Sequence, residues 1–303
     1  MATFNLKEIA NEYAIKQSKM VDDLTEKTPI LERVRWEKAS HGLWNMAEKV
    51  NDVTGAQFVN ADAALPTIET SSDLVKTDLQ VLGGEMEQAQ DTVDQFGGPS
   101  KYFAKKEPII LKKAGQDTEI KLYYDNWQAK AIADSTYTSA GASSGGVYSI
   151  MIVRFEEGVN MGLFDPAQFN SGSLLNRELI NGGSLYHLRS KSGVLGYGVA
   201  LKGRFGWQNL STKTVHAILN INASNLPTQT EIEDAIAGVH GSSKDTLIMC
   251  HPKCFNMSFG PFKGTALQMG VEDKEYNRVI DSFNRVPIIT SYNIYDGTET
   301  VTS

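Results

Sequence analysis

Both cysteines of the chain lie four residues apart beside a histidine, in the stretch Leu247–Phe255 (LIMCHPKCF). Thiolates and imidazoles are common zinc ligands, and paired cysteines can carry redox chemistry. The spacing of Cys250 and Cys254 matches neither the C-x-x-C redox motif nor the paired C-x-x-C of a structural zinc site. His240 or His251 could complete a zinc site, but free cysteines usually pack as small apolar side chains. We therefore predict packing as the role of both thiols, and no metal ligands.

A second candidate for chemistry is the glycine-rich stretch Gly196–Gly203 (GYGVALKG), which is similar to a dinucleotide-binding loop. Such a loop connects a strand to a helix, and its glycines let the backbone approach the phosphates. Here the third glycine is displaced and the segment has the pattern of a strand. We therefore predict no cofactor, and we assign these glycines to a twisted or bulged strand.

The charged residues form no recognisable catalytic set. Four carboxylates could supply an acid–base pair, but their spacing is more typical of a solvated face; they are Glu85, Glu87, Asp91 and Asp94. Five lysines form a basic stripe that could contact phosphate or an acidic neighbour, although an exposed helix face is commoner; they are Lys101, Lys105, Lys106, Lys112 and Lys113. The histidines are scattered, and no G-x-S-x-G accompanies them; they are His41, His187, His216, His240 and His251. No catalytic residue is predicted, so we expect no enzyme.

The bulk composition allows a large structural protein. The 303 residues, 41% of them hydrophobic, suffice for two compact domains or one large one. A formal net charge of −7 argues against a surface that grips nucleic acid strongly. The first residues (MATFNLKEIANEYAIKQ) contain no apolar run of a secretory signal, and no segment approaches the roughly 20 apolar residues of a membrane span. We expect a soluble protein made inside the cell.

Two segments near the N-terminus look incomplete by themselves. Residues 5–17 predict a short amphipathic helix, capped by Asn5 and Glu8, whose apolar side must dock on another body; that side holds Leu6, Ile9, Ala10 and Tyr13. Residues 42–82 contain two apolar runs, GAQFV and DLQVL, which predict an extended two-stranded excursion. Such a ribbon is marginal alone and needs other surfaces to lie on.

The pattern from Pro99 to Tyr124 predicts a long helix. One side of it would carry Tyr102, Phe103, Ile110 and Ala114. Pro108 lacks a backbone donor and Gly115 has low helix propensity, so we expect a kinked helix or two consecutive ones. The small residues of 134–146 predict a linker.

Strand patterns follow at Tyr148–Phe155, Tyr197–Trp207 and Val215–Ile221. Thr228 and Glu231 form a capping box at the start of a helix, and Gly241 is placed to end it. That helix should bury Ile232, Ala235, Ile236 and Val239. Residues 247–250 then predict a buried strand, followed by a helix that begins at Pro252.

The order of these parts resembles the HK97-type major capsid proteins of tailed bacteriophages. The strongest likeness is in Val279–Ile294 (VIDSFNRVPIITSYNI), where a turn and a Val-Pro-Ile stretch return the chain to the main sheet. TLIMCHPKCFNM resembles the strand, proline and short helix of that family. LGGEMEQAQDTVDQFGG and SIMIVRFEEGVNMGLFDP are similar to the branch found in short-tailed phages.

The resemblance implies an α+β, HK97-type capsid fold in five parts. These would be an N-terminal arm (1–40), an extended E-loop (41–84), a P-domain with the long spine helix (85–135), an A-domain that includes the glycine-rich β region (136–283), and a C-terminal strand that returns to the core (284–303).

The resemblance also implies a structural role. Copies of the chain would form pentamers and hexamers of an icosahedral shell around the double-stranded DNA of a tailed bacteriophage, in a virion assembled in the host cytoplasm. The expected partners are other copies, scaffolding, portal and decoration proteins, and packaged DNA through weak non-specific contact; no membrane partner is expected. The alternatives are an encapsulin-like compartment, a phage tail or decoration protein, and an enzyme that uses the glycine-rich β region.

Overall fold

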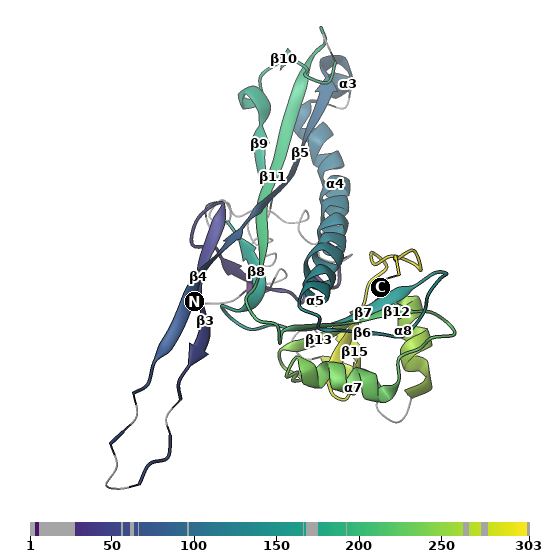
Figure 1. Cartoon of the computed structure of the whole chain (residues 1–303). Helices are drawn as coiled ribbons and strands as arrows, with labels where there is room; N and C mark the ends of the chain where they lie inside the picture. The colour runs from purple at the N-terminus through teal and green to yellow at the C-terminus, as the bar shows by residue number, and fades with distance from the viewer. Residues whose placement is uncertain are drawn as a thin grey trace.

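Two β-sheets, a long helix that joins them, and a projecting two-stranded ribbon make up the molecule (Figure 1). The computed structural model describes residues 4–5, 28–55, 57–60, 64–65, 67–95, 97–165, 167, 175–191, 193–262, 267–273 and 278–301. Within this part of the chain, no helix is long and apolar enough to cross a membrane.

The first sheet is built around the long strand β11 (Leu195–Asn209). Strand β5 (Gln80–Ala89) pairs antiparallel with ten consecutive residues of β11, from Gly196 to Phe205. The remaining strands of this sheet are β10 (Tyr186–His187), β9 (Asn176–Leu179) and β8 (Asn160–Phe164), all paired with β11, then β2 (Arg35–Lys38) on β8 and β1 (Phe4–Asn5) on β2. The predicted glycine-rich strand is therefore confirmed as the centre of a sheet.

The long helix α4 (Pro99–Lys121) runs beside this sheet (Figure 1). It follows the short helix α3 (Gln90–Gln95) and continues through the π-helical turn η1 (Leu122–Gln128) into α5 (Ala129–Ala133). Of the two alternatives, the prediction of two consecutive helices is wrong, because one helix continues through Pro108. Proline inside a helix costs about 3 kcal/mol, and the helix gains compensating contacts by packing on the sheet.

The buried face of α4 differs in one position from the prediction. Phe103 is buried, and Tyr102 and Ala114 pack beside it, as expected. Ile110 is 38% exposed, and Leu111 lies in the core instead, against Val199 and Leu201 of β11.

The second sheet is covered on both faces. Its strands run in the order β14 (Leu267–Asp273), β15 (Arg278–Phe283), β16 (Val286–Thr290), β13 (Thr246–Cys250), β7 (Tyr148–Arg154), β12 (Val215–Ile221) and β6 (Tyr137–Ser139). Helices α7 (Gln229–Gly238) and α8 (Pro252–Phe259), with the short η3 (Gly260–Phe262) after α8, pack on one face. Residues of η1, α5 and 30–36 cover the other face and make the larger core.

Several local predictions in this region are confirmed. The Thr228–Glu231 capping box is present in both directions. Helix α7 ends in a Schellman arrangement, in which the Gly241 N–H donates to Ile236 O (2.9 Å) and the His240 N–H donates to Ala237 O (2.9 Å). The residue with positive φ is His240, at 53°, rather than Gly241. Strand β16 pairs parallel with β13, so the C-terminal strand does return to the sheet.

Other expectations need correction. The predicted linker 134–146 contains β6, because its backbone pairs parallel with β12. The segment 136–283, expected as one domain, divides between the sheets: β8 to β11 pair in the first and β7, β12 and β13 in the second. Of the predicted arm 1–40, residues such as Ile30 and Leu31 are buried in the core. The predicted helix 5–17 lies outside the described residues except for Asn5, which pairs in β1.

Candidate functional site

The ribbon of strands β3 (Trp44–Val53) and β4 (Thr70–Asp78) projects away from both sheets (Figure 1). The two-stranded excursion is confirmed, but its strands are displaced from the apolar runs that predicted it: β3 precedes GAQFV, and β4 lies between GAQFV and DLQVL. At its base, the Asn45 amide donates to Gln208 of β11 (2.7 Å), and His41 stacks on Trp44 (3.6 Å between ring centroids). Beyond these contacts at its base, the ribbon has no packing partner in the described chain. Its stability must therefore come from outside the subunit.

One face of the ribbon, called the apolar face below, carries exposed apolar side chains beside polar ones such as Glu48. Side chains alternate between the faces of a strand, so the antiparallel register determines which ones share a face. Met46, opposite Lys76, and Val50, opposite Ser72, point to the same side as Leu74. Val50 is 55% and Leu74 72% exposed. The opposite side carries half-buried pairs near the base, such as Ala47 with Val75.

A bulge extends this apolar face toward the tip. The register shifts between Val50 and Asp52, so that Asn51 has no opposite residue. Val53 then lies opposite Thr70, on the same side as Val50. Val53 comes three residues after Val50, and the side chains of a regular strand alternate between its two faces. Without the extra residue of the bulge, Val53 would therefore point to the face opposite Val50. Because of the bulge, Val53 joins Met46 and Val50 on the same exposed surface of β3.

The tip of the ribbon adds more exposed apolar side chains. Phe58 is fully exposed, and Leu65 is 82% exposed. Soluble monomers rarely leave continuous apolar surface uncovered, and such surfaces usually mark interfaces. The ribbon as a whole is therefore the candidate functional site, and its chemistry suits another protein surface rather than a small substrate.

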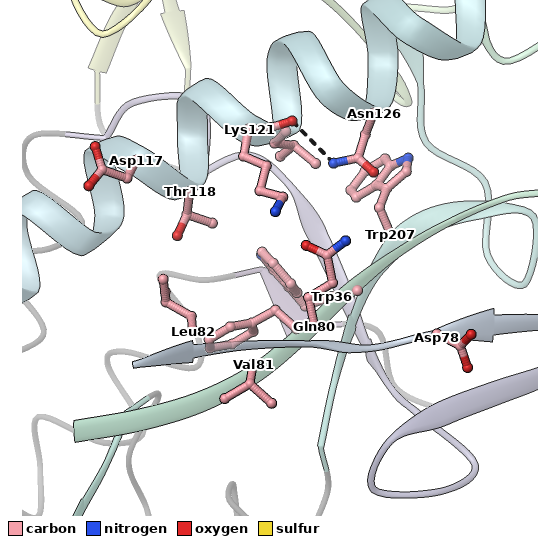
Figure 2. Close-up of a pocket in the computed structure, with 13 residues that line it drawn as sticks. Trp36, Asp78, Gln80, Val81, Leu82, Asp117, Thr118, Lys121, Asn126 and Trp207 are labelled. Atoms are coloured by element: carbon pink, nitrogen blue, oxygen red, sulfur yellow. Dashed lines mark hydrogen bonds between the residues drawn. The ribbon is translucent and has the colours of Figure 1, made fainter. Parts of the chain in front are cut away.

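A cavity lies where the ribbon joins the body, between α4 with η1 on one side and β5 with β11 on the other (Figure 2). We call it the base cavity; its volume is about 210 Å³. Its walls combine Trp36, Leu82, Phe205 and Trp207 with polar groups such as Lys121. The buried indole N–H of Trp36 has no hydrogen-bond acceptor among the described residues.

A buried carboxyl group fastens both terminal regions to the long helix. Glu119 of α4 is fully buried and accepts hydrogen bonds from the Ile30 N–H (2.8 Å) and from the side-chain amide of Asn293. Burial raises the pKa of Glu119 to about 7, and the charge of Glu32 adds to this effect, although the hydrogen bonds oppose it.

A second carboxyl group, that of the half-buried Glu299, lies six residues after Asn293. Glu299 accepts from Tyr124 Oη of η1 and from Ser149 Oγ of β7, both at 2.9 Å. Tyr124 also stacks on Tyr295 (4.4 Å between centroids) and accepts from its N–H. Burial raises the pKa of Glu299 to about 7. Residues 293–299 therefore form a strap between the helix and the second sheet, held by two carboxyl groups with raised pKa values.

The predicted acidic face lies at the far end of the first sheet. Glu87 of β5 accepts from Tyr186 Oη (2.7 Å) and the Ser190 N–H (2.9 Å), and these bonds hold its pKa near 2. Glu85 pairs with Arg189 (3.0 Å). Asp91 and Asp94 belong to α3. The structure thus gives the two glutamates a role in fastening β10 to β5.

Glycine at 198 is needed for this fastening. A Cβ there would lie 2.1 Å from Tyr186 Oη and 2.8 Å from Ile180 Cδ1. We expect Gly198→Ala to displace Tyr186 from Glu87 and to lower the free energy of unfolding by about 1–3 kcal/mol. Urea unfolding measures this, with Gly84→Ala as the control, because a Cβ at Gly84 meets nothing within 4 Å. Equal stability of the two variants would contradict the prediction.

The cysteines and histidines have structural positions. Cys250 and Cys254 are buried between β13 and α8, and the Cys254 thiol lies 3.7 Å from Ser258 Oγ. The His251 side chain caps α8 by accepting from the Lys253 N–H (3.2 Å). Across the described ranges, no group of three or more His, Cys, Asp or Glu residues is placed to hold a metal ion.

The other histidines and the lysines lie apart from one another. His216 contacts Thr138 Oγ1 (3.1 Å), while His187 lies in β10 and His240 at the end of α7. On α4, Lys101, Lys106 and Lys113 are exposed, and Lys113 pairs with Asp117 (2.6 Å).

Comparison with known proteins identifies the fold. No protein-family model matches the chain, and no curated protein matches its sequence. A chain of the bacteriophage JBD30 capsid superposes with a TM-score of 0.53 at 8% identity, covering 85% of this chain and 88% of that one. A chain of bacteriophage Epsilon15 superposes with a TM-score of 0.52 at 13% identity, covering 88% of each. The expected α+β, HK97-type capsid fold is confirmed.

Proposed function

We propose that this chain is the major capsid protein of a tailed bacteriophage, a non-enzymatic protein whose copies build an icosahedral shell. The observation that carries the proposal is the ribbon, which exposes apolar side chains along one face, far from the body of its own subunit. A shell protein needs such an element, because each subunit must bury surface on its neighbours to hold the lattice together. The shared fold supports the same function.

The parts of the chain receive corresponding roles. We assign the P-domain to the first sheet with α4, the A-domain to the second sheet with α7 and α8, and the E-loop to the ribbon. The segment before Thr28 would be the N-terminal arm. Pentamers and hexamers of the chain would enclose double-stranded DNA, which the acidic subunit would touch only weakly. Scaffolding, portal and decoration proteins would be further partners in a virion assembled in the host cytoplasm.

Sedimentation and electron microscopy of the purified, overexpressed protein test the proposal. We expect closed particles, or rings of five and six subunits, because the ribbon face gains burial only between copies. Nucleic acid inside particles isolated from a natural source separates a phage capsid from an encapsulin-like compartment, which would hold protein cargo. A chain that stays monomeric even at high concentration would count against any shell.

A further inference from the structure

We propose that the base cavity of one subunit receives the ribbon tip of a second copy, with the Phe58 side chain as its occupant. The inference rests on the proposed function, since it names the contact through which the ribbon acts. It joins two features of the same chain: a fully exposed phenylalanine, and a cavity lined by aromatic rings.

The size and lining of the cavity suit a phenyl ring. Its volume is about 210 Å³, and an engineered apolar cavity of about 150 Å³ binds benzene. Trp36, which is labelled in Figure 2, already contacts Phe205 edge to face at 5.6 Å between ring centroids, and both side chains line the cavity. Aromatic rings favour such edge-to-face and offset contacts, so a further ring can join the pair.

The polar groups of the cavity match a segment of backbone around that ring. The Trp36 indole N–H is buried without an acceptor in the described structure, and buried donors are nearly always paired in complete assemblies. A carbonyl of the incoming tip can accept this hydrogen bond if the cavity lining opens on docking, because the indole nitrogen is out of reach of solvent in the free subunit. The described residues beside Phe58, which are 57–60 (QFVN), carry no charge, so the tip itself brings no ion that would lose its hydration on docking.

The occupant must come from a second copy. Asp78, the last residue of β4, lines the cavity, whereas the tip follows the other end of the ribbon. Nine residues of strand at roughly 3.3 Å each separate the two by about 30 Å. The ribbon extends away from α4 and β11 (Figure 1), whose residues line the cavity, so a subunit cannot insert its own Phe58.

Photo-cross-linking tests the contact directly. The photoreactive residue p-benzoylphenylalanine is placed at position 58, and isotopically heavy and light subunits are mixed before assembly. We expect heavy–light cross-links from position 58 to peptides containing 78–82 or 117–126. Heavy–light cross-links in assembled particles that map elsewhere would overturn the cavity as the docking site but leave the shell function standing. Subunits that never associate would overturn both.

A pair of substitutions tests the energetic importance of the same contact. We expect Phe58→Ala to weaken subunit association at least tenfold without loss of folding, because this side chain is fully exposed in the subunit. Leu185→Ala is the matched control, because Leu185 is also an exposed apolar residue but does not line the cavity; this variant should assemble normally. Equal assembly of the two variants would overturn the inference.

Discussion

Replacing Val50 and Leu74 together by lysine is expected to abolish particle assembly while leaving the subunit folded. Both side chains lie on the apolar face of the ribbon and are more than half exposed, so the change removes little that stabilises the monomer. Burying a valine or leucine contributes about 1.5–3 kcal/mol. Losing both weakens each contact by about 3–6 kcal/mol, or roughly two to four orders of magnitude in affinity.

The matched control places the same charge outside that face. Asn51→Lys with Ser71→Lys adds two lysines at polar, exposed positions of the same ribbon. Asn51 donates to Asp73, whose side chain lies on the opposite face from Leu74. Analytical ultracentrifugation should show shells or rings for the wild type and this control, and monomers for the apolar-face variant. Normal assembly of the Val50/Leu74 variant would show that this face is not an interface.

Glu299→Gln should become increasingly stabilising, relative to the wild type, as the pH rises from 5 to 8. The pKa of Glu299 is about 7 in the folded chain and close to 4.5 when exposed. Between these values the folded state holds a proton that the unfolded state has lost, so wild-type stability falls as pH rises through this window. A shift of this size corresponds to about 3 kcal/mol for a buried group. Glutamine keeps an acceptor oxygen but never ionises.

Glu119→Gln should show the same trend, because its pKa is also raised to about 7 by burial. The amide of Asn293 can turn to present its oxygen to the new glutamine. The measurement is urea unfolding of the unassembled subunit at several pH values. At each pH, the free energy of unfolding of the wild type is subtracted from that of the variant. The value of this difference at pH 8 is then compared with its value at pH 5, so that any loss of hydrogen bonding that does not depend on pH cancels.

Glu87→Gln serves as the control for this pH dependence. Its pKa is held near 2 by Tyr186 and Ser190, so its ionised form stabilises the chain at all pH values above about 4.5, and this stabilisation is lost only as pH falls toward 2. No trend between pH 5 and 8 is expected for this variant. A flat difference for Glu119→Gln and Glu299→Gln as well would contradict the raised pKa values.

Features that depend on neighbouring residues in the sequence could be predicted from the sequence. The capping box at Thr228, the strand that ends at Cys250 and the helix that begins at Pro252 are all present. Each is decided within one or two turns of chain, by a side chain that meets a nearby backbone group or by a short apolar run. The order of such elements was also sufficient for the resemblance to the HK97-type fold.

The candidate site was only partly predictable. The sequence indicated a ribbon within 42–82 that needs a partner, but its apolar face depends on the register of β3 and β4 and on the bulge at Asn51. Register is a property of two strands together, and one residue of slip exchanges the faces. The base cavity joins Trp36, Leu82 and Phe205, which are far apart in the sequence, so no local pattern could have revealed it.

By itself, then, the sequence determined the type and order of most elements, because these follow from local periodicity and capping. Only the tertiary structure decided how they combine. It placed β8 to β11 beside the long helix rather than with the second sheet, and it kept α4 intact through Pro108 by packing. It also buried Glu119 and half-buried Glu299, whose raised pKa values arise from loss of solvent. Pairing, packing and desolvation are interactions between residues distant in the chain, so they exist only once the chain has folded.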